Sequence, residues 1–185
     1  MTINYEDISL RDYSLADIHD DIRWLNVDND WRLLDTPWAL IDEVDEDEYF
    51  ELMEFHVQAV SKSDEFRSRL EIYCNEKHIG FVSAFYCDDK CELTDSKRAT
   101  QIQLSVQICQ KEYRAKGYGK KALSAYIDYC KKNTSLPICI KTHSENIPML
   151  KLAVKLKFEP YARDNKAYTA FGKVYDVIYM KLKNG

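Results

Sequence analysis

A short glycine-containing segment, residues 114–119, has the composition of an anion-binding loop. It reads Arg-Ala-Lys-Gly-Tyr-Gly and is followed directly by Lys120 and Lys121. The first turn of a helix has unpaired N–H groups and a partial positive charge, and glycines let the backbone approach a phosphate closely. The segment therefore predicts binding of a phosphate-containing ligand, provided that a strand precedes it and a helix follows it. Without that setting, two glycines indicate no more than a flexible turn.

The residues around this loop predict the required strand and helix. Residues 101–108 alternate strictly between polar and apolar, which is the period of a strand. After the loop, apolar residues recur at helical spacing with lysines on the opposite face; they are Ala122, Leu123, Tyr126, Ile127 and Cys130. A short strand at residues 137–141 and a helix starting at Asn146, with Pro148 just behind it, follow.

The rest of the chain predicts a mixed α/β fold in a single domain, residues 1–185. Further strands are expected at residues 8–11, 69–74, 78–86, 158–163 and 173–182. Two helices are expected, one capped by Ser14 and one ending near residues 59–60. A helix between two strands favours a parallel pair, whereas the tight connection at residues 75–77 favours a hairpin, so the sheet should be mixed. A length of 185 residues fits one domain.

The loop matches neither of two common nucleotide-binding signatures. A Walker loop requires Gly-x-x-x-x-Gly-Lys-Ser/Thr, which the chain lacks. The dinucleotide signature Gly-x-Gly-x-x-Gly fails at its third glycine, where Ala122 stands.

The loop instead resembles the pyrophosphate-binding signature of the GNAT superfamily of N-acetyltransferases, Arg/Gln-x-x-Gly-x-Gly/Ala. Residues 142–146 with Met149, Ala153, Lys155, Leu156 and Phe158 resemble the Thr-x-x-x-Asn…Lys-Leu-Gly-Phe segment of the same superfamily. Leu10-Arg11 and residues 172–176 are similar to the RimJ/RimL-like branch, and residues 31–38 look like a variant of the segment after its first helix. The resemblance spans essentially the whole chain.

The resemblance implies a fold and a cofactor. The fold is a mixed, mostly antiparallel central sheet with a splayed parallel strand pair, flanked by about four helices. The cofactor is acetyl-CoA as acetyl donor. Residues 106–108 would separate from the parallel neighbour near Cys139 and pair with the pantetheine arm, while amides of residues 114–119 would hold the pyrophosphate. The implied cofactor-binding residues are Val106, Ile108, Arg114, Lys116, Gly117, Tyr118, Gly119, Lys120 and Asn146. For Asn146, simple helix capping is an equal alternative.

The implied reaction is direct acetyl transfer to a primary amine: a protein N-terminus, a polyamine-like amine or another small amine. A base must neutralise the amine. Many relatives place a glutamate where this chain has Gln103, and a proton-donating tyrosine where it has Ala153. The catalytic residues are therefore unassigned, with Asp35, Glu145 or a water chain as candidate bases. The alternative function is a non-catalytic GNAT-fold module that binds acyl-CoA. Lys157 replaces the usual glycine before Phe158, so a different helix end is expected there.

Trp31, Asp35 and Trp38 could form an acceptor pocket, since aromatic walls and one carboxylate suit a cation. Core packing with a turn at residues 36–37 is the alternative. Residues 1–110 carry 25 acidic against 10 basic residues, and residues 111–185 carry 6 against 16. This asymmetry favours a cationic acceptor and a polyanionic cofactor. His143 could orient the substrate or serve only as hydrogen-bonded structure.

Other classes are disfavoured. A net charge of −5 suits nucleic acid poorly. No membrane helix or signal peptide is evident, and six scattered cysteines indicate reduced cytoplasmic thiols. Cys87, Cys91 and His78 give half a zinc site at most, so no metal is expected. A monomer or homodimer is expected.

Overall fold

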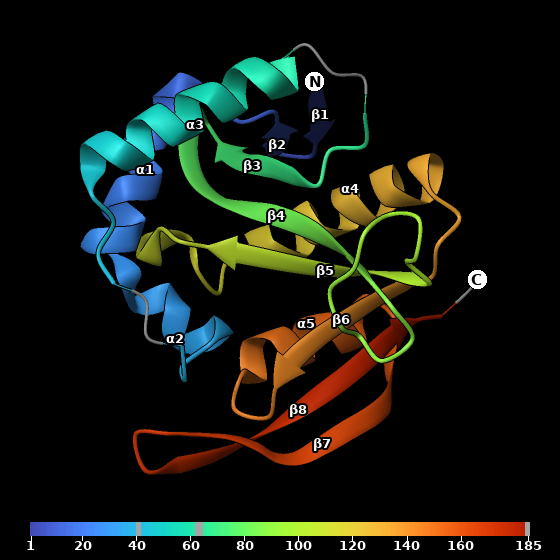
Figure 1. Ribbon diagram of the computed structural model, residues 1–185. Helices are drawn as coiled ribbons and strands as arrows, with labels where there is room; N and C mark the ends of the chain where they lie inside the picture. The colour runs from blue at the N-terminus through green and yellow to red at the C-terminus, as the bar shows by residue number, and fades with distance from the viewer. Residues whose placement is uncertain (40–41, 62–64, 184–185) are drawn as a thin grey trace. The chain divides into compact units, whose positions relative to one another are not determined.

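The computed structural model describes residues 1–39, 42–61 and 65–183. Its elements are β1 Thr2–Tyr5, β2 Ile8–Arg11, α1 Leu15–Asn26, the 3-10 turn η1 Asn29–Trp31, α2 Arg32–Asp35, α3 Glu46–Ser61, β3 Arg69–Cys74, β4 Lys77–Cys87, β5 Gln101–Ile108, the 3-10 turn η2 Lys111–Tyr113, α4 Tyr118–Asn133, β6 Ile138–His143, α5 Ile147–Lys155, β7 Phe158–Ala170 and β8 Lys173–Leu182 (Figure 1). The strands form a sheet in the order β1-β2-β3-β4-β5-β6-β8-β7.

Internal contacts divide the chain into two compact units. Unit 1 comprises Met1–Trp31, Leu40–Val82 and Val106–Ala125. Unit 2 comprises Arg32–Ala39, Ser83–Ser105 and Tyr126–Gly185. The chain passes between them within β4, β5 and α4, and each unit is described by itself below.

In unit 1, helices α1 and α3 lie side by side and pack through their apolar faces (Figure 1). The buried residues of α1 contact Tyr49, Phe50, Met53 and Val57 of α3. The helix α1 begins after Ser14, as predicted, and forms a capping box in which the backbone N–H of Ser14 donates to Oδ2 of Asp17 at 2.8 Å. At the β3–β4 turn, Asn75 and Glu76 both have positive φ, as a two-residue type I′ hairpin requires.

A buried network of charges lies beneath α1. His78 is 2% exposed and contacts three carboxylates, Glu71 through Nε2 at 3.0 Å, and Asp20 and Asp17 through Nδ1 at 3.2 and 3.4 Å. Arg69 bonds to both Asp21 and Glu71. Burial lowers the pKa of His78, but the hydrogen bonds and charges of its carboxylate partners outweigh it and raise that pKa to about 9. His78 is therefore a buried cation at neutral pH.

Gly80 permits a close approach of β4 to β5. A Cβ at this position would lie 1.9 Å from the carbonyl oxygen of Gln107, a distance that no side chain tolerates. Just beyond, the amides of Cys109 and Gln110 both donate to the carbonyl of Ile79, at 2.9 and 3.2 Å. These contacts end β5 and set the starting point of the glycine loop.

In unit 2, β6, β8 and β7 are antiparallel neighbours, and β7 and β8 form a long hairpin (Figure 1). The parallel pair is β5 and β6, with Ile102 opposite Ile138 and Gln103 opposite Cys139. Within the described residues the parallel register ends at this second pair, whereas β5 continues to Ile108. The expected mixed, mostly antiparallel sheet with one short parallel pair is confirmed.

Three details differ from the expectations. The strand β1 was not predicted, although its four residues, Thr-Ile-Asn-Tyr, alternate between polar and apolar. Five helices occur in the described chain where about four were expected. The additional helix, α2, is a single turn of four residues. The absence of glycine at position 157 does not change the way α5 ends. Lys157 itself takes the left-handed conformation, with φ 66°.

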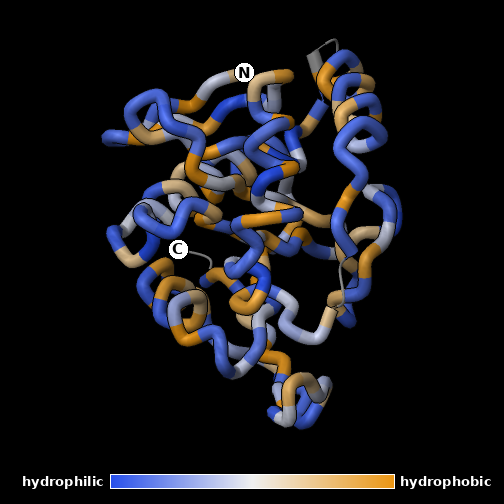
Figure 2. Tube along the Cα trace, turned by 90° about the vertical axis from the view of Figure 1, so that its left-hand side faces the viewer, coloured by the Kyte–Doolittle hydropathy of each residue, from blue (hydrophilic) through white to orange (hydrophobic). Residues whose placement is uncertain are grey.

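Hydrophobic and hydrophilic residues alternate along the helices rather than gathering in long apolar runs (Figure 2). Among the described residues, no helix is both long enough and apolar enough to cross a membrane.

Candidate functional site

The glycine loop of unit 1 has the geometry of an anion cradle. The turn η2 leads into Ala115, with φ 59°, and Gly117, with φ 92°, before α4 begins at Tyr118. The carbonyl of Gly117 accepts the N–H of Lys120 at 3.0 Å, so the amides of Tyr118 and Gly119 precede the first intrahelical bond. A Cβ at position 117 would meet nothing within 4 Å, so the space above the loop is open. Backbone conformation, not crowding, is what requires glycine here.

The side chain of Arg114 braces this loop from outside. Its Nε donates to the carbonyl of Ile108 at 2.8 Å, and one Nη donates to that of Cys109 at 2.6 Å. The same guanidinium makes a bidentate pair with Asp30, at 2.7 and 2.9 Å, and lowers the pKa of that carboxyl. The charge of Arg114 is thus matched within unit 1, and two of its four hydrogen bonds hold the end of β5.

Lysines supply the remaining positive charge near the loop. Lys121 pairs with Asp7 at 2.6 Å and with Glu6 at 3.1 Å. Lys116 and Lys120 are exposed, and neither lies within 4 Å of a carboxylate in the described part of the chain. The cations that remain available to a bound anion at this loop are therefore Lys116 and Lys120.

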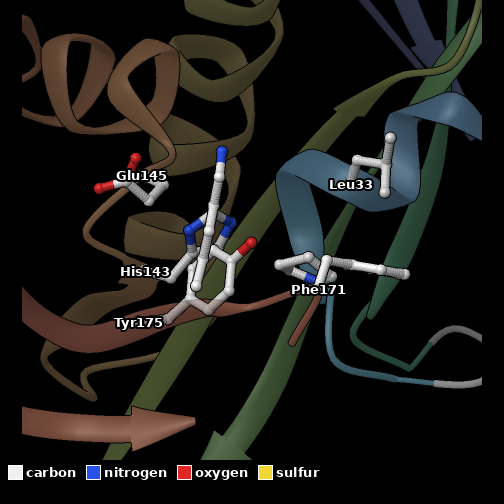
Figure 3. A pocket seen from close by; sticks show the side chains of 7 residues that line it. Leu33, His143, Glu145, Phe171 and Tyr175 are labelled. Atoms are coloured by element: carbon white, nitrogen blue, oxygen red, sulfur yellow. The ribbon is translucent and has the colours of Figure 1, made fainter. Parts of the chain in front are cut away.

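Unit 2 contains a pocket of about 500 Å³ between α2 and the β7–β8 hairpin. Figure 3 shows Leu33 and Phe171 on one side, and His143, Tyr175 and Glu145 on the other. The full lining is Leu33, Pro37, His143, Glu145, Phe171, Lys173 and Tyr175. Its walls combine four apolar or aromatic residues with His143, Glu145 and Lys173, so polar groups line a large part of the pocket.

An aromatic cluster supports the pocket. The rings of Trp38 and Tyr168 stack with centroids 4.0 Å apart and planes 5° from parallel. Trp38 also approaches Tyr175 and meets the edge of His143 at 5.6 Å. Tyr175 meets His143 at 5.2 Å with nearly perpendicular planes. The imidazole is consequently held in one orientation between two aromatic rings.

The carbonyl of Leu34 anchors two side chains from the β6–α5 connection. Nε2 of His143 lies 3.1 Å from this oxygen, and Nδ2 of Asn146 also donates to it. Oδ1 of Asn146 accepts the N–H of Met149 at 3.1 Å and so caps α5. Capping by Asn146 is therefore observed, and its predicted contact with a cofactor stays a prediction.

The structure brings together only part of the predicted acceptor site. Trp38 supports the pocket, and Asp35 lies exposed on the adjacent α2 without lining it. Trp31 belongs to unit 1, where its indole N–H donates to the carbonyl of Trp24 and its ring meets Phe81. Of the two candidate bases, Glu145 lines the pocket.

The two residues that replace the expected glutamate and tyrosine lie on the strand and the helix predicted for them. Gln103 is on β5 opposite Cys139, and Ala153 is fully buried on α5. Neither side chain can exchange a proton at neutral pH.

Sequence reasoning missed Leu33, Tyr168, Phe171, Lys173 and Tyr175. Four of these five lie on the β7–β8 hairpin, and their pairing across it was not predicted because β7 was expected to end at residue 163. Tyr168 and Tyr175 lie on either side of Gly172. This arrangement is the signal that could have indicated a hairpin with an aromatic face.

Several known structures share this fold. The chain is 20% identical to yncA of Salmonella typhimurium, a putative acetyltransferase solved with its cofactor acetyl-CoA, with a TM-score of 0.69 over 96% of this chain and 94% of that one. It is 13% identical to the ribosomal L7/L12 α-N-protein acetyltransferase RimL in complex with coenzyme A, with a TM-score of 0.72 over 98% and 97%. The ribosomal-protein-alanine N-acetyltransferase of Brucella melitensis is 15% identical, with a TM-score of 0.66 over 93% and 97%.

At these identities the structural matches establish the fold. No curated protein matches the sequence at a significant level. The sequence profile described as "Acetyltransferase (GNAT) domain", however, matches residues 7–159, which is most of the chain. The chain belongs to the GNAT family of acetyltransferases.

Proposed function

We propose that this protein is an acetyl-CoA-dependent N-acetyltransferase that moves the acetyl group directly to a primary amine. The observation that carries the proposal is the open loop at residues 114–119, in which a left-handed glycine precedes a helix N-terminus. Two phosphates of a bound pyrophosphate would find unpaired amides and a favourable dipole there. Two of the similar structures contain acetyl-CoA or coenzyme A, which supports the same ligand.

The residues of the loop fit the cofactor in chemical terms. The amides of Tyr118 and Gly119 would donate to the pyrophosphate, and Lys116 and Lys120 would balance its charge. Val106 and Ile108 would offer backbone groups to the pantetheine arm. For Arg114 we propose a place in the same cofactor site, where its guanidinium braces the loop through the carbonyl of Ile108 and the carboxylate of Asp30.

We propose the pocket around His143 and Tyr175 as the acceptor site. Trp38 and Glu145 belong to this proposed site, and Trp31, which is in unit 1, is not among the residues that line the pocket. Aromatic walls with one carboxylate suit an ammonium group, which both a peptide N-terminus and a small amine carry. We further propose that residues 1–185 act as one domain, as a monomer or homodimer.

The alternative is a GNAT-fold module that holds an acyl-CoA without turnover. Gln103 and Ala153 favour it, because both stand where many relatives carry a proton-transferring side chain. Both functions predict that acetyl-CoA binds, and only the first predicts release of free thiol.

Thermal unfolding with acetyl-CoA, followed by a thiol-release assay, separates these functions. A ligand at ~100 times its dissociation constant stabilises the fold by about 2.7 kcal/mol, which raises the Tm by roughly 5–10 °C for a chain of this size. Absence of a shift at millimolar acetyl-CoA would overturn both functions. A shift without thiol release from spermidine, lysine amide or a short unblocked peptide would favour the non-catalytic module.

A further inference from the structure

His143 has one ring nitrogen without a partner. The side chain is 2% exposed and lines the acceptor pocket. Its Nδ1 is buried and makes no hydrogen bond within the described residues, whereas Nε2 lies 3.1 Å from the carbonyl oxygen of Leu34. An orphaned buried nitrogen is costly unless a ligand supplies its partner. The nitrogen therefore needs an explanation that internal packing does not give.

The neighbours of His143 determine which nitrogen carries the proton. A carbonyl oxygen only accepts hydrogen bonds, so Nε2 of His143 must be the N–H that donates to Leu34. Asn146 cannot supply an alternative arrangement, since its Oδ1 already accepts from Met149 and its Nδ2 donates to the same carbonyl. In a neutral ring the unprotonated nitrogen is then Nδ1, with its lone pair available.

The surroundings of the ring favour its neutral form. Burial lowers the pKa of His143, against the opposing effects of the Leu34 hydrogen bond and the charges of Asp35 and Glu145. Asp35 comes from α2, and Glu145 follows β6. From β8, Lys173 and Tyr175 line the same pocket. A neutral imidazole with an available lone pair is a base that is ready to accept a proton.

We propose that Nδ1 of His143 is the general base that takes the proton from the acceptor amine during acetyl transfer. This inference rests on the proposed function and assigns the proton acceptor that Gln103 cannot be. Trp38 and Tyr175 hold the ring edge-on, and the Leu34 carbonyl fixes its tautomer, so the lone pair keeps a constant direction. Glu145, in the same wall, serves to attract the cationic amine.

The chemical step conserves atoms and electrons. The cationic amine first releases one proton to solvent. The lone pair of the resulting neutral amine then forms a bond to the thioester carbonyl carbon, and the amine N–H proton that is lost on bond formation passes to Nδ1 of His143. The carbon–sulfur bond then breaks, and its electron pair leaves on sulfur as the thiolate. The imidazolium returns its proton to that thiolate, which restores His143 and completes the products, an amide and a free thiol.

The substitution His143→Gln tests this role. Glutamine can place an amide N–H near the position of Nε2 and so keep the bond to Leu34, but it has no basic nitrogen. We expect kcat for thiol release with the amine panel to fall by about 10² or more, with an unchanged acetyl-CoA thermal shift. His56→Gln is the matched control, because His56 is exposed on α3 and belongs to unit 1. It should retain the wild-type rate.

The pH profile and the ring tautomer give independent readouts. The wild-type kcat should rise with pH through a limb below the ordinary histidine range near 6.5, and His143→Gln should lose that limb. Nitrogen-15 correlation spectra of the wild-type imidazole should show a protonated Nε2 and an unprotonated Nδ1. This measurement decides the case even where the variant fails to fold.

The outcomes distinguish this inference from the function on which it rests. Turnover by the wild type with an equally fast His143→Gln variant would overturn the assigned base alone, as would a protonated Nδ1 in the neutral ring. An acetyl-CoA shift without turnover for the wild type would overturn the proposed function, and the base with it.

Discussion

The loop at residues 114–119 and the pocket around His143 differ in how their geometry is specified. The loop is one continuous segment, and its proposed ligand-binding groups are backbone amides whose directions depend on φ at Ala115 and Gly117. The pocket is assembled from side chains that lie between Leu33 and Tyr175. Each region also has a buried histidine nearby in its unit: His78 is held as a cation, and His143 as a neutral ring. The comparison teaches that the proposed cofactor site is built from backbone groups, and the proposed acceptor site from side chains.

The two histidines should give opposite dependences of stability on pH. The pKa of His78 is raised from 6.5 to about 9, so its contribution is complete below pH 6.5 and is lost as the pH rises towards 9. We expect a loss of roughly 3 kcal/mol across this window. His143 has a lowered pKa and should instead cost stability as the pH falls below 6.5. Denaturant unfolding at pH 6 and 9 checks this for wild type and His78→Gln; an equal loss in the variant would contradict the assignment.

The substitution Gly117→Val should disrupt the conformation of the loop and leave the pocket unchanged. Gly117 has φ 92°, which a β-branched residue scarcely adopts, so the loop must change its path. We expect acetyl-CoA affinity to fall by about 100-fold, measured by calorimetry. Gly172→Val is the matched control, because Gly172 also has a positive φ and open space at Cβ, but lies in the β7–β8 turn. If both variants lose affinity equally, general destabilisation is the cause.

The substitution Trp38→Ala should impair amine binding and leave acetyl-CoA binding unchanged. Its ring stacks on Tyr168 and orients His143, and such aromatic pairs contribute about 0.5–1.5 kcal/mol. We expect the KM for the amine to rise by about 10-fold, while the Kd for acetyl-CoA stays unchanged. Trp38→Phe should recover most of the loss. An altered acetyl-CoA affinity would show that the two regions are not separable in this way.

A smaller effect should show how Arg114 contributes to the loop. If it acts as a brace, Arg114→Lys cannot reproduce the paired contact with Asp30 or both carbonyl contacts, and the acetyl-CoA Kd should rise by about 3–10-fold. Asp30→Asn should weaken binding in the same direction. If Arg114 instead binds phosphate by charge, lysine would preserve affinity and Asp30→Asn would improve it.

Most of the fold was predictable, because its strands and helices carry clear periods and caps. Ser14 and Asp17 marked the start of α1, and Asn146 marked that of α5. The loop was predictable for the same reason: its function depends on consecutive residues whose types restrict the backbone. The pocket was not, since its shape depends on the length of the β7–β8 hairpin and on where residues 32–38 lie within unit 2. The tautomer of His143 depends on a backbone carbonyl that no residue type reveals.

That carbonyl belongs to Leu34, whose side chain is 38% exposed. Every amino acid has a backbone carbonyl oxygen. Relatives of this protein are therefore free to vary the residue at position 34, provided that the backbone keeps its path. They are not free to change the number of residues between α1 and α2, since an insertion or deletion at residues 27–31 would move the oxygen away from His143 and Asn146. Across such relatives, the length of this segment should therefore stay constant while its residue types change.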